Sequence, residues 1–210
     1  MNFTRNQTVI AAAIVLAIIL LGAFSAAKMT DNKEKEAAET LTEMYGEDFT
    51  PVNSDASLMS NIFDVTVQSE ETKNVYDFHV SGDSIQGNFY NENVNIELNK
   101  LIESYTNSFA MVNAKMDKLE QPATISEAGI QEISATIIAL KAIDDETASK
   151  IAEVIQKETG PIPIRFEILI VENEADYNGV TFEIKNYFQR SNVTKSSFGS
   201  LKYEEQVFEF

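Results

Sequence analysis

The chain has 210 residues, of which 44% are apolar and 23% are charged, with 16 basic against 33 acidic residues and a net charge of −17. This length corresponds to one or two domains, and the composition is that of a folded globular protein. An acidic surface repels phosphate groups, so nucleic acids and anionic lipid headgroups are poor partners. The chain has no cysteine and a single histidine, His79, which excludes disulfides, thiol chemistry and metal sites built from several histidines.

The N-terminal segment is a predicted transmembrane helix. Residues 6–27 contain no charged residue, and residues 9–27 are almost entirely Ala, Ile, Leu and Val. At about 1.5 Å per residue, the second stretch spans roughly 28 Å, close to the thickness of the hydrocarbon core of a bilayer. We therefore assign residues 1–28 as a membrane anchor. A cleavable signal peptide is the alternative, because Ser25-Ala26-Ala27 supplies the small residues of a cleavage site; the protein would then be secreted.

The charges beside this segment leave two orientations open. Lys28, Lys33 and Lys35 follow it and only Arg5 precedes it, which by the positive-inside rule places the large domain in the cytoplasm. The three lysines are interleaved with acidic residues, however, and an apolar segment at the extreme N-terminus is typical of an export signal. We expect a single-pass protein of the cell membrane with an extracytoplasmic domain.

Residues 29–119 are predicted to form a first α+β half. A helix is expected over residues 34–45, with Gly46 as its C-terminal stop. A loop containing Pro51 follows. Apolar and polar residues then alternate over residues 63–67 and 76–80, which predicts two strands, and residues 85–89 make a third.

A long helix is expected to connect the two halves. Its apolar residues recur every three or four positions: Val94, Leu98, Leu101, Ile102, Tyr105, Phe109, Val112, Met116 and Leu119. A break near Asn107-Ser108 is the alternative to one continuous helix.

Residues 120–210 are predicted to form a second α+β half. A strand is expected over 133–140, with a helix as the alternative because of its Ala and Leu residues. A helix over 146–159 follows, which Asp144 or Asp145 caps and Gly160 ends. A strand over 164–170 is expected to join a strand over 180–184 through a tight hairpin turn at Asn178-Gly179. A last strand covers residues 201–210. The predicted fold class is α+β, with an N-terminal transmembrane helix followed by antiparallel sheets packed with helices in two halves.

One stretch of the chain resembles a loose group of proteins. A helix that ends in Tyr45-Gly46-Glu47-Asp48-Phe49, then extended strands, the pair Phe89-Tyr90 and a long helix are similar to small membrane-anchored proteins and lipoproteins of Gram-positive bacteria. The resemblance covers residues 34–105. It implies a cystatin-like αβ fold and an extracytoplasmic location, and it brings no catalytic residue. The cysteine that carries lipid in the lipoproteins is absent here.

Three groups of residues were weighed as sites. His79 lies on the polar side of a strand, and a lone histidine there is most often solvated. Glu174, Asp176 and Asn178, followed by Gly179, match the first places of a calcium loop, but Lys185 stands where a bidentate glutamate belongs. An aromatic set near the C-terminus is interpreted as core, with a partner surface as the alternative: Phe188, Phe198, Tyr203, Phe208 and Phe210.

No catalytic, cofactor-binding or metal-binding residue is assigned, and no cofactor is expected. The expected function is that of a non-enzymatic, membrane-anchored extracytoplasmic module that binds a protein or peptide at the cell surface. The alternative is an envelope-acting enzyme or calcium-dependent binder that uses the acidic loop over 174–178.

Overall fold

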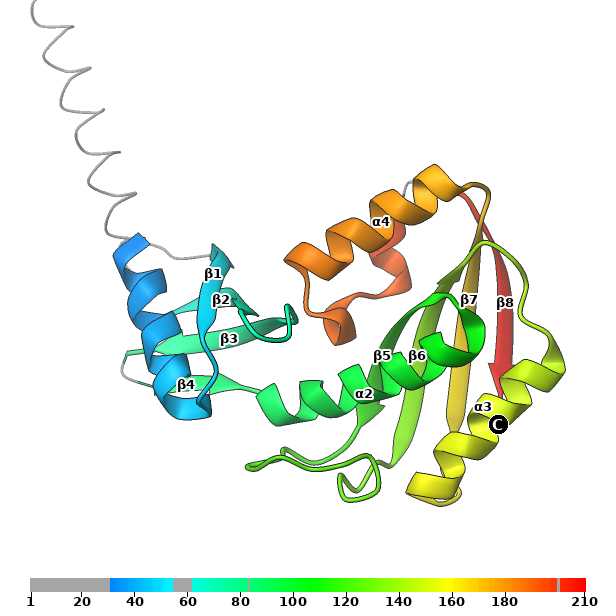
Figure 1. Cartoon of the computed structure of the whole chain (residues 1–210), viewed down its shortest axis with the longest axis horizontal. Coiled ribbons are helices and arrows are strands. Elements are labelled where there is room, and N and C mark those ends of the chain that lie inside the picture. Colours follow the sequence, from blue (N-terminus) through cyan, green and yellow to red (C-terminus); the bar gives the residue numbers. More distant parts are fainter. Residues whose placement is uncertain (1–30, 55–61, 83, 200) are drawn as a thin grey trace, which may run out of the picture.

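The computed structural model describes residues 31–54, 62–82, 84–199 and 201–210. In this part of the chain the fold is α+β, as predicted, with two four-stranded sheets joined by a helix (Figure 1). The predicted transmembrane helix lies outside the described residues. Among the residues that are described, no helix combines the length and the apolar character needed to cross a membrane.

The first sheet is an antiparallel meander. It contains β1 (Phe49–Ser54), β2 (Ile62–Ser69), β3 (Val75–Ser81) and β4 (Ser84–Gly87) in chain order. β2 and β3 confirm the predicted strands. β1 lies where a loop containing Pro51 was expected; an edge strand tolerates a residue without an N–H donor. The predicted helix at 34–45 is present over residues 31–45 and buries Ala37, Ala38 and Leu41. Met44, expected on its inner face, is 51% exposed.

Helix α2 (Phe89–Thr106) contributes to the cores of both sheets. Phe89 and Ile96 pack in the core of the first sheet, whereas Val94, Leu98 and Ile102 pack in that of the second. The predicted strand at 85–89 therefore ends at Gly87.

The long helix expected as far as residue 119 ends at Thr106. Asn107 adopts the left-handed conformation with φ 49°, which asparagine tolerates better than most residues, and β5 (Phe109–Lys115) follows. This strand is buried on both faces, so its sequence shows no alternation of apolar and polar residues.

A ladder of side chains on α2 covers the edge of β5 and the segment after it. Its members are spaced four residues apart, on one face of the helix: Asn91, Asn95, Asn99 and Glu103. Their side-chain oxygens accept the backbone N–H groups of Leu119, Ala114, Val112 and Ala110, at 3.0, 3.0, 2.7 and 3.1 Å. These bonds satisfy edge donors that would otherwise be free to pair with another strand.

The second sheet is mixed, which corrects the antiparallel meander expected here. Its order is β5, β6 (Glu132–Ala139), β7 (Ile164–Val171) and β8 (Tyr203–Glu209). β6 and β7 run parallel because α3 (Asp145–Thr159) crosses between them. The predicted α3 is confirmed: Asp144 accepts the N–H of Thr147 at 2.7 Å, and Gly160 ends the helix. The expected boundary between the two halves, at residue 119, falls between β5 and β6, which are strands that pair with each other.

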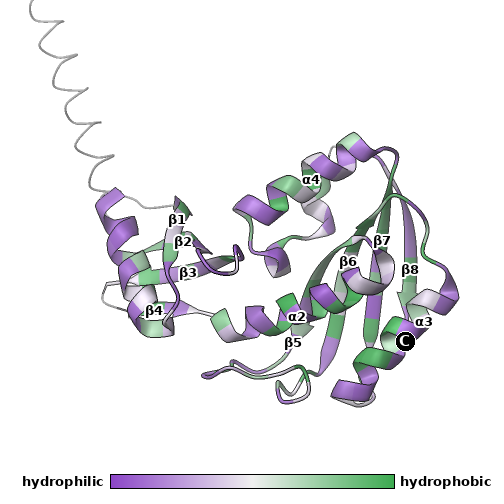
Figure 2. Ribbon diagram, in the orientation of Figure 1, coloured by the Kyte–Doolittle hydropathy of each residue, from purple (hydrophilic) through white to green (hydrophobic). Residues whose placement is uncertain are grey.

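Helices cover both faces of the second sheet. α2 and α3 pack on one face over the larger core, and α4 (Glu174–Tyr187) packs on the other (Figure 1). Figure 2 shows apolar residues along much of the central strands, and both hydrophilic and apolar residues on each helix.

Helix α4 contradicts the predicted hairpin at Asn178-Gly179 and the predicted strand over 180–184. Asn173 caps the helix by accepting the N–H of Asp176 at 3.0 Å. Thr181 and Ile184 are buried, whereas Phe182, expected in the core, is 61% exposed. The antiparallel partner of β7 is β8 instead, so α4 is left to cover the face of the sheet.

Candidate functional site

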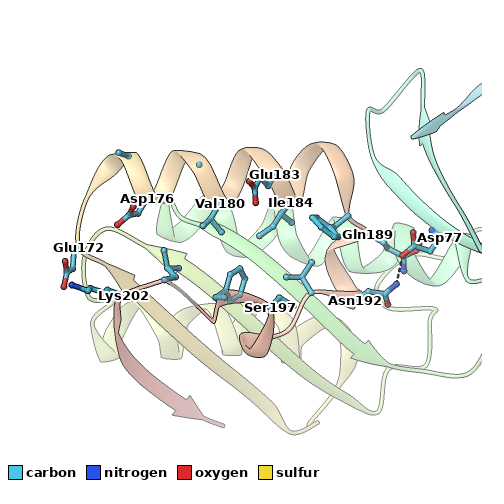
Figure 3. A pocket seen from close by; sticks show the side chains of 16 residues that line it. Asp77, Glu172, Asp176, Val180, Glu183, Ile184, Gln189, Asn192, Ser197 and Lys202 are labelled. Atoms are coloured by element: carbon cyan, nitrogen blue, oxygen red, sulfur yellow. Dashed lines mark hydrogen bonds between the residues drawn. The ribbon is translucent and has the colours of Figure 1, made fainter. Parts of the chain in front are cut away.

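A groove of about 810 Å³ lies between α4 and the segment over residues 188–202 (Figure 3). Its apolar lining comes from both sides: Val180 and Ile184 from α4, and Val193, Phe198 and Leu201 from the opposite segment. Ile184 and Phe198 are buried, but the other three are only partly buried. The groove therefore presents apolar surface that an incoming side chain could cover.

Short helical turns build the wall opposite α4. These are η1 (Arg190–Asn192) and η2 (Lys195–Phe198). At the start of η2, the backbone carbonyl of Thr194 accepts the N–H of Ser197 at 2.8 Å, and the Ser197 hydroxyl in turn accepts the N–H of Thr194 at 3.3 Å. Lys195 pairs with Glu205 of β8, and Phe198 inserts into the core under α4. The wall is thus attached to the second sheet at two points.

The rim of the groove is acidic. Glu172, Asp176, Glu183 and Asp77 line it, against one cation, Lys202. Glu172 and Lys202 lie at the end where α4 begins, and Asp77 lies at the other end (Figure 3). Glu172 and Glu183 take part in none of the ion pairs among the described residues. Their charge is available to a ligand.

The far end of the groove is the junction between the two sheets. The Gln189 side chain is 1% exposed and accepts the backbone N–H of Asp77 on β3 at 2.8 Å. Asn192 donates to the Asp77 carboxylate at 2.8 Å. The groove wall therefore holds the first sheet as well as the second.

A buried carboxyl group completes this junction. Glu92 on α2 is 1% exposed, and its Oε2 accepts hydrogen bonds from the side chains of Asn95, Gln189 and Ser191. The pKa of Glu92 is raised to about 7: burial is the main cause and the nearby Asp77 adds to it, while the hydrogen bonds from Ser191 and Asn95 oppose the increase. None of these three hydrogen-bonding partners carries a positive charge.

His79 lies where the sequence placed it, on the exposed face of β3. Its Nδ1 is 2.8 Å from Asp64, and both side chains are at least half exposed. Among the described residues, no nucleophilic side chain is hydrogen-bonded to this ring, so the pair lacks the third group of a hydrolytic triad.

The residues of the proposed calcium loop lie on α4. Glu174 and Asp176 form its acidic first turn, and Asn178 follows in the next turn. A helix does not wrap its side chains around an ion as a calcium loop does. In the described part of the chain, no three histidine, cysteine, aspartate or glutamate side chains gather in a metal-binding arrangement.

The C-terminal aromatic set divides between core and surface. Phe198 is buried and Tyr203 and Phe208 are partly buried, whereas Phe188 is 53% exposed and lines the groove. Phe210 is also exposed.

No pattern in the sequence singles out Gln189, Ser191 or Glu92. Their polar side chains are buried only because residues about 100 positions apart meet at the junction. By contrast, the four-residue spacing of Asn91, Asn95 and Asn99 is visible in the sequence, and it was a signal for one polar helix face with a structural role.

Comparisons with protein families, with curated proteins and with solved structures found no match to this chain.

Proposed function

We propose that this protein is a non-enzymatic, membrane-anchored extracytoplasmic module, and that it binds a segment of a protein or peptide in the groove beside α4. The observation that carries the proposal is the groove itself, about 810 Å³ in volume and lined by apolar side chains from two elements. A volume of this size accommodates several side chains of a partner. The membrane attachment rests on the uncharged segment over residues 6–27.

A photoreactive amino acid in the groove tests the binding function. Ser197 is exposed and lines the groove, so the photoreactive residue replaces it in the full chain produced in cells. We expect an adduct that maps to a single segment of one partner.

Two matched variants on α4 decide whether the adduct depends on the groove. Val180→Asp places a charge on the apolar lining and should abolish the adduct. Phe182→Asp changes an exposed residue that is not part of the lining and should leave the adduct intact. An adduct that survives Val180→Asp, or one that maps to many unrelated proteins, contradicts the proposal.

The location has a separate test. Protease added to intact cells stripped of their wall should degrade the domain over residues 29–210. Digestion of the domain only after lysis would mean that the domain lies in the cytoplasm, which is what the positive-inside rule indicates for the lysines after the apolar segment.

A further inference from the structure

Resting on the proposed function of the same groove, we infer that its ligand is a cationic segment, in which apolar side chains are flanked by lysine or arginine. The two features that point to this ligand are the apolar lining and the distribution of the carboxylates around it. Either feature alone is common on protein surfaces, whereas here they occur together in one cavity.

The carboxylates are spread along the groove. Asp176 and Glu183 are seven residues apart on α4, which corresponds to about 10 Å along a helix. Glu172 lies beyond Asp176 at the end where α4 begins, and Asp77 lies at the junction end (Figure 3). A ligand that lies along α4 therefore meets carboxylates from one end of its path to the other, with Lys202 as the one cation of the lining, beside Glu172.

Some of these carboxylates are already engaged and others are not. Asp77 accepts hydrogen bonds from Thr66 and Asn192, and Asp176 accepts one from Asn173. The carboxylates of Glu172 and Glu183 have no hydrogen bond or ion pair among the described residues. These two are the groups that we expect to attract cations of the ligand most strongly.

The apolar side chains supply the second part of the recognition. Val180, Val193 and Leu201 are partly buried and line the groove between the carboxylates. Covering them removes apolar surface from water, which favours binding. At the junction end, the exposed ring of Phe188 offers a face on which a lysine or arginine can stack. A purely polar cationic ligand would use only the charges.

Three synthetic peptides test this inference against the full chain in mild detergent. In the first peptide, leucine residues are flanked by lysine residues. The second has glutamate in place of each lysine, and the third has the composition of the first in scrambled order. Dissociation constants come from fluorescence anisotropy at two ionic strengths. We expect the leucine–lysine peptide to bind most tightly, and its affinity to fall as salt is added, because salt screens exposed charges.

Carboxylate variants locate the charge effect. Glu183→Gln and Glu172→Gln should each weaken binding of the leucine–lysine peptide by about twofold to fivefold, the range expected for an exposed ion pair. Glu153→Gln, at an exposed position of α3 outside the groove, is the matched control and should leave the affinity unchanged.

Each outcome separates the inference from the function on which it rests. If none of the three peptides binds, the proposed groove function fails. If the leucine–glutamate peptide binds as tightly as the leucine–lysine peptide, and Glu183→Gln has no effect, the groove binds peptides but the cationic ligand is refuted. If the scrambled peptide binds equally well, or Glu153→Gln weakens binding as much as Glu183→Gln, the attraction comes from the net charge of −17, and the inference is also refuted.

Discussion

Glu92→Gln should remove a pH dependence of stability that originates in one buried carboxyl group. Glu92 lies at the junction of the two sheets, where Asn95 of its own helix and Gln189 and Ser191 of the groove wall donate hydrogen bonds to it. Glutamine keeps the size of the side chain and an oxygen that can accept these bonds, but it carries no charge at any pH.

The size of this pH dependence follows from the pKa of Glu92. Burial raises the pKa of Glu92 from 4.5 to about 7. Between these values the folded protein binds the proton more tightly than the unfolded chain, so stability falls as the pH rises. The contribution of the protonated group is complete below about pH 4.5 and is lost as the pH rises through about 7. At about 1.36 kcal/mol for each pH unit between the two pKa values, the loss amounts to about 3 kcal/mol.

Other titratable groups lie near the junction. Asp77 on β3 raises the pKa of Glu92 by repulsion, and the Tyr76 hydroxyl, whose own pKa burial raises to about 12, stays neutral in this range. Lys73, Lys185 and Arg190 line a small cavity of about 310 Å³ that Glu92 also reaches. Because Glu92→Gln leaves all of these groups in place, a difference between the variant and the parent reports on Glu92 itself.

Urea unfolding of the parent and the variant at pH values from about 4.5 to about 8 measures the effect. Glu97→Gln, at an exposed position of the same helix, is the control for the loss of one negative charge. We expect the free energy of unfolding of the parent to fall relative to that of Glu92→Gln by about 3 kcal/mol over this range. Curves for Glu92→Gln and Glu97→Gln that run parallel to each other would refute the assignment of a raised pKa to Glu92.

Local signals in the sequence identified most elements of the fold. Helix α3 was predicted within one residue at its start and to the residue at its end, because Asp144 and Gly160 are strong cap signals that tertiary contacts do not override. The strands β2, β3, β6 and β7 were also found, since each buries a regular set of apolar residues.

Pairing was harder to predict because it depends on residues far apart in the chain. The strand–helix–strand order around α3 is the pattern of a parallel crossover, but the hairpin expected at Asn178-Gly179 directed the interpretation toward a meander. In the structure, the strand beside β7 is β8 (Tyr203–Glu209), which lies after the expected hairpin in the chain. The segment that contains Asn178-Gly179 lies outside the sheet, where it forms α4 and one side of the groove.

The groove therefore could not be predicted from the sequence. Its acidic residues are few among 33, and its apolar residues were assigned to strands of the core. Only the three-dimensional structure shows the groove. Val180 and Ile184 lie on one side of α4, and Val193 and Phe198 face them from the segment after it. Sequence periodicity describes the burial of an element but not the surface that it faces.

Three substitutions test the fold that positions the groove. Asn99→Ala leaves the buried N–H of Val112 without its acceptor, and urea unfolding should register a loss of about 2 kcal/mol; an unchanged midpoint would show that the ladder on α2 is dispensable. Gly87→Ala places a Cβ atom 2.2 Å from the Phe78 ring, so we expect a loss of more than about 1 kcal/mol, because the buried ring must move. Gly179→Ala is expected to have the opposite effect. Gly179 lies inside α4, and a Cβ atom there meets nothing within 4 Å. Alanine is more favourable than glycine in the middle of a helix by about 0.5–1 kcal/mol, so the melting temperature should rise. In a tight hairpin turn at Asn178-Gly179 the glycine would instead need a positive φ, and alanine would destabilise the protein. The direction of the change in melting temperature therefore decides between the helix and the hairpin, and a decrease would refute α4 and the groove that it lines.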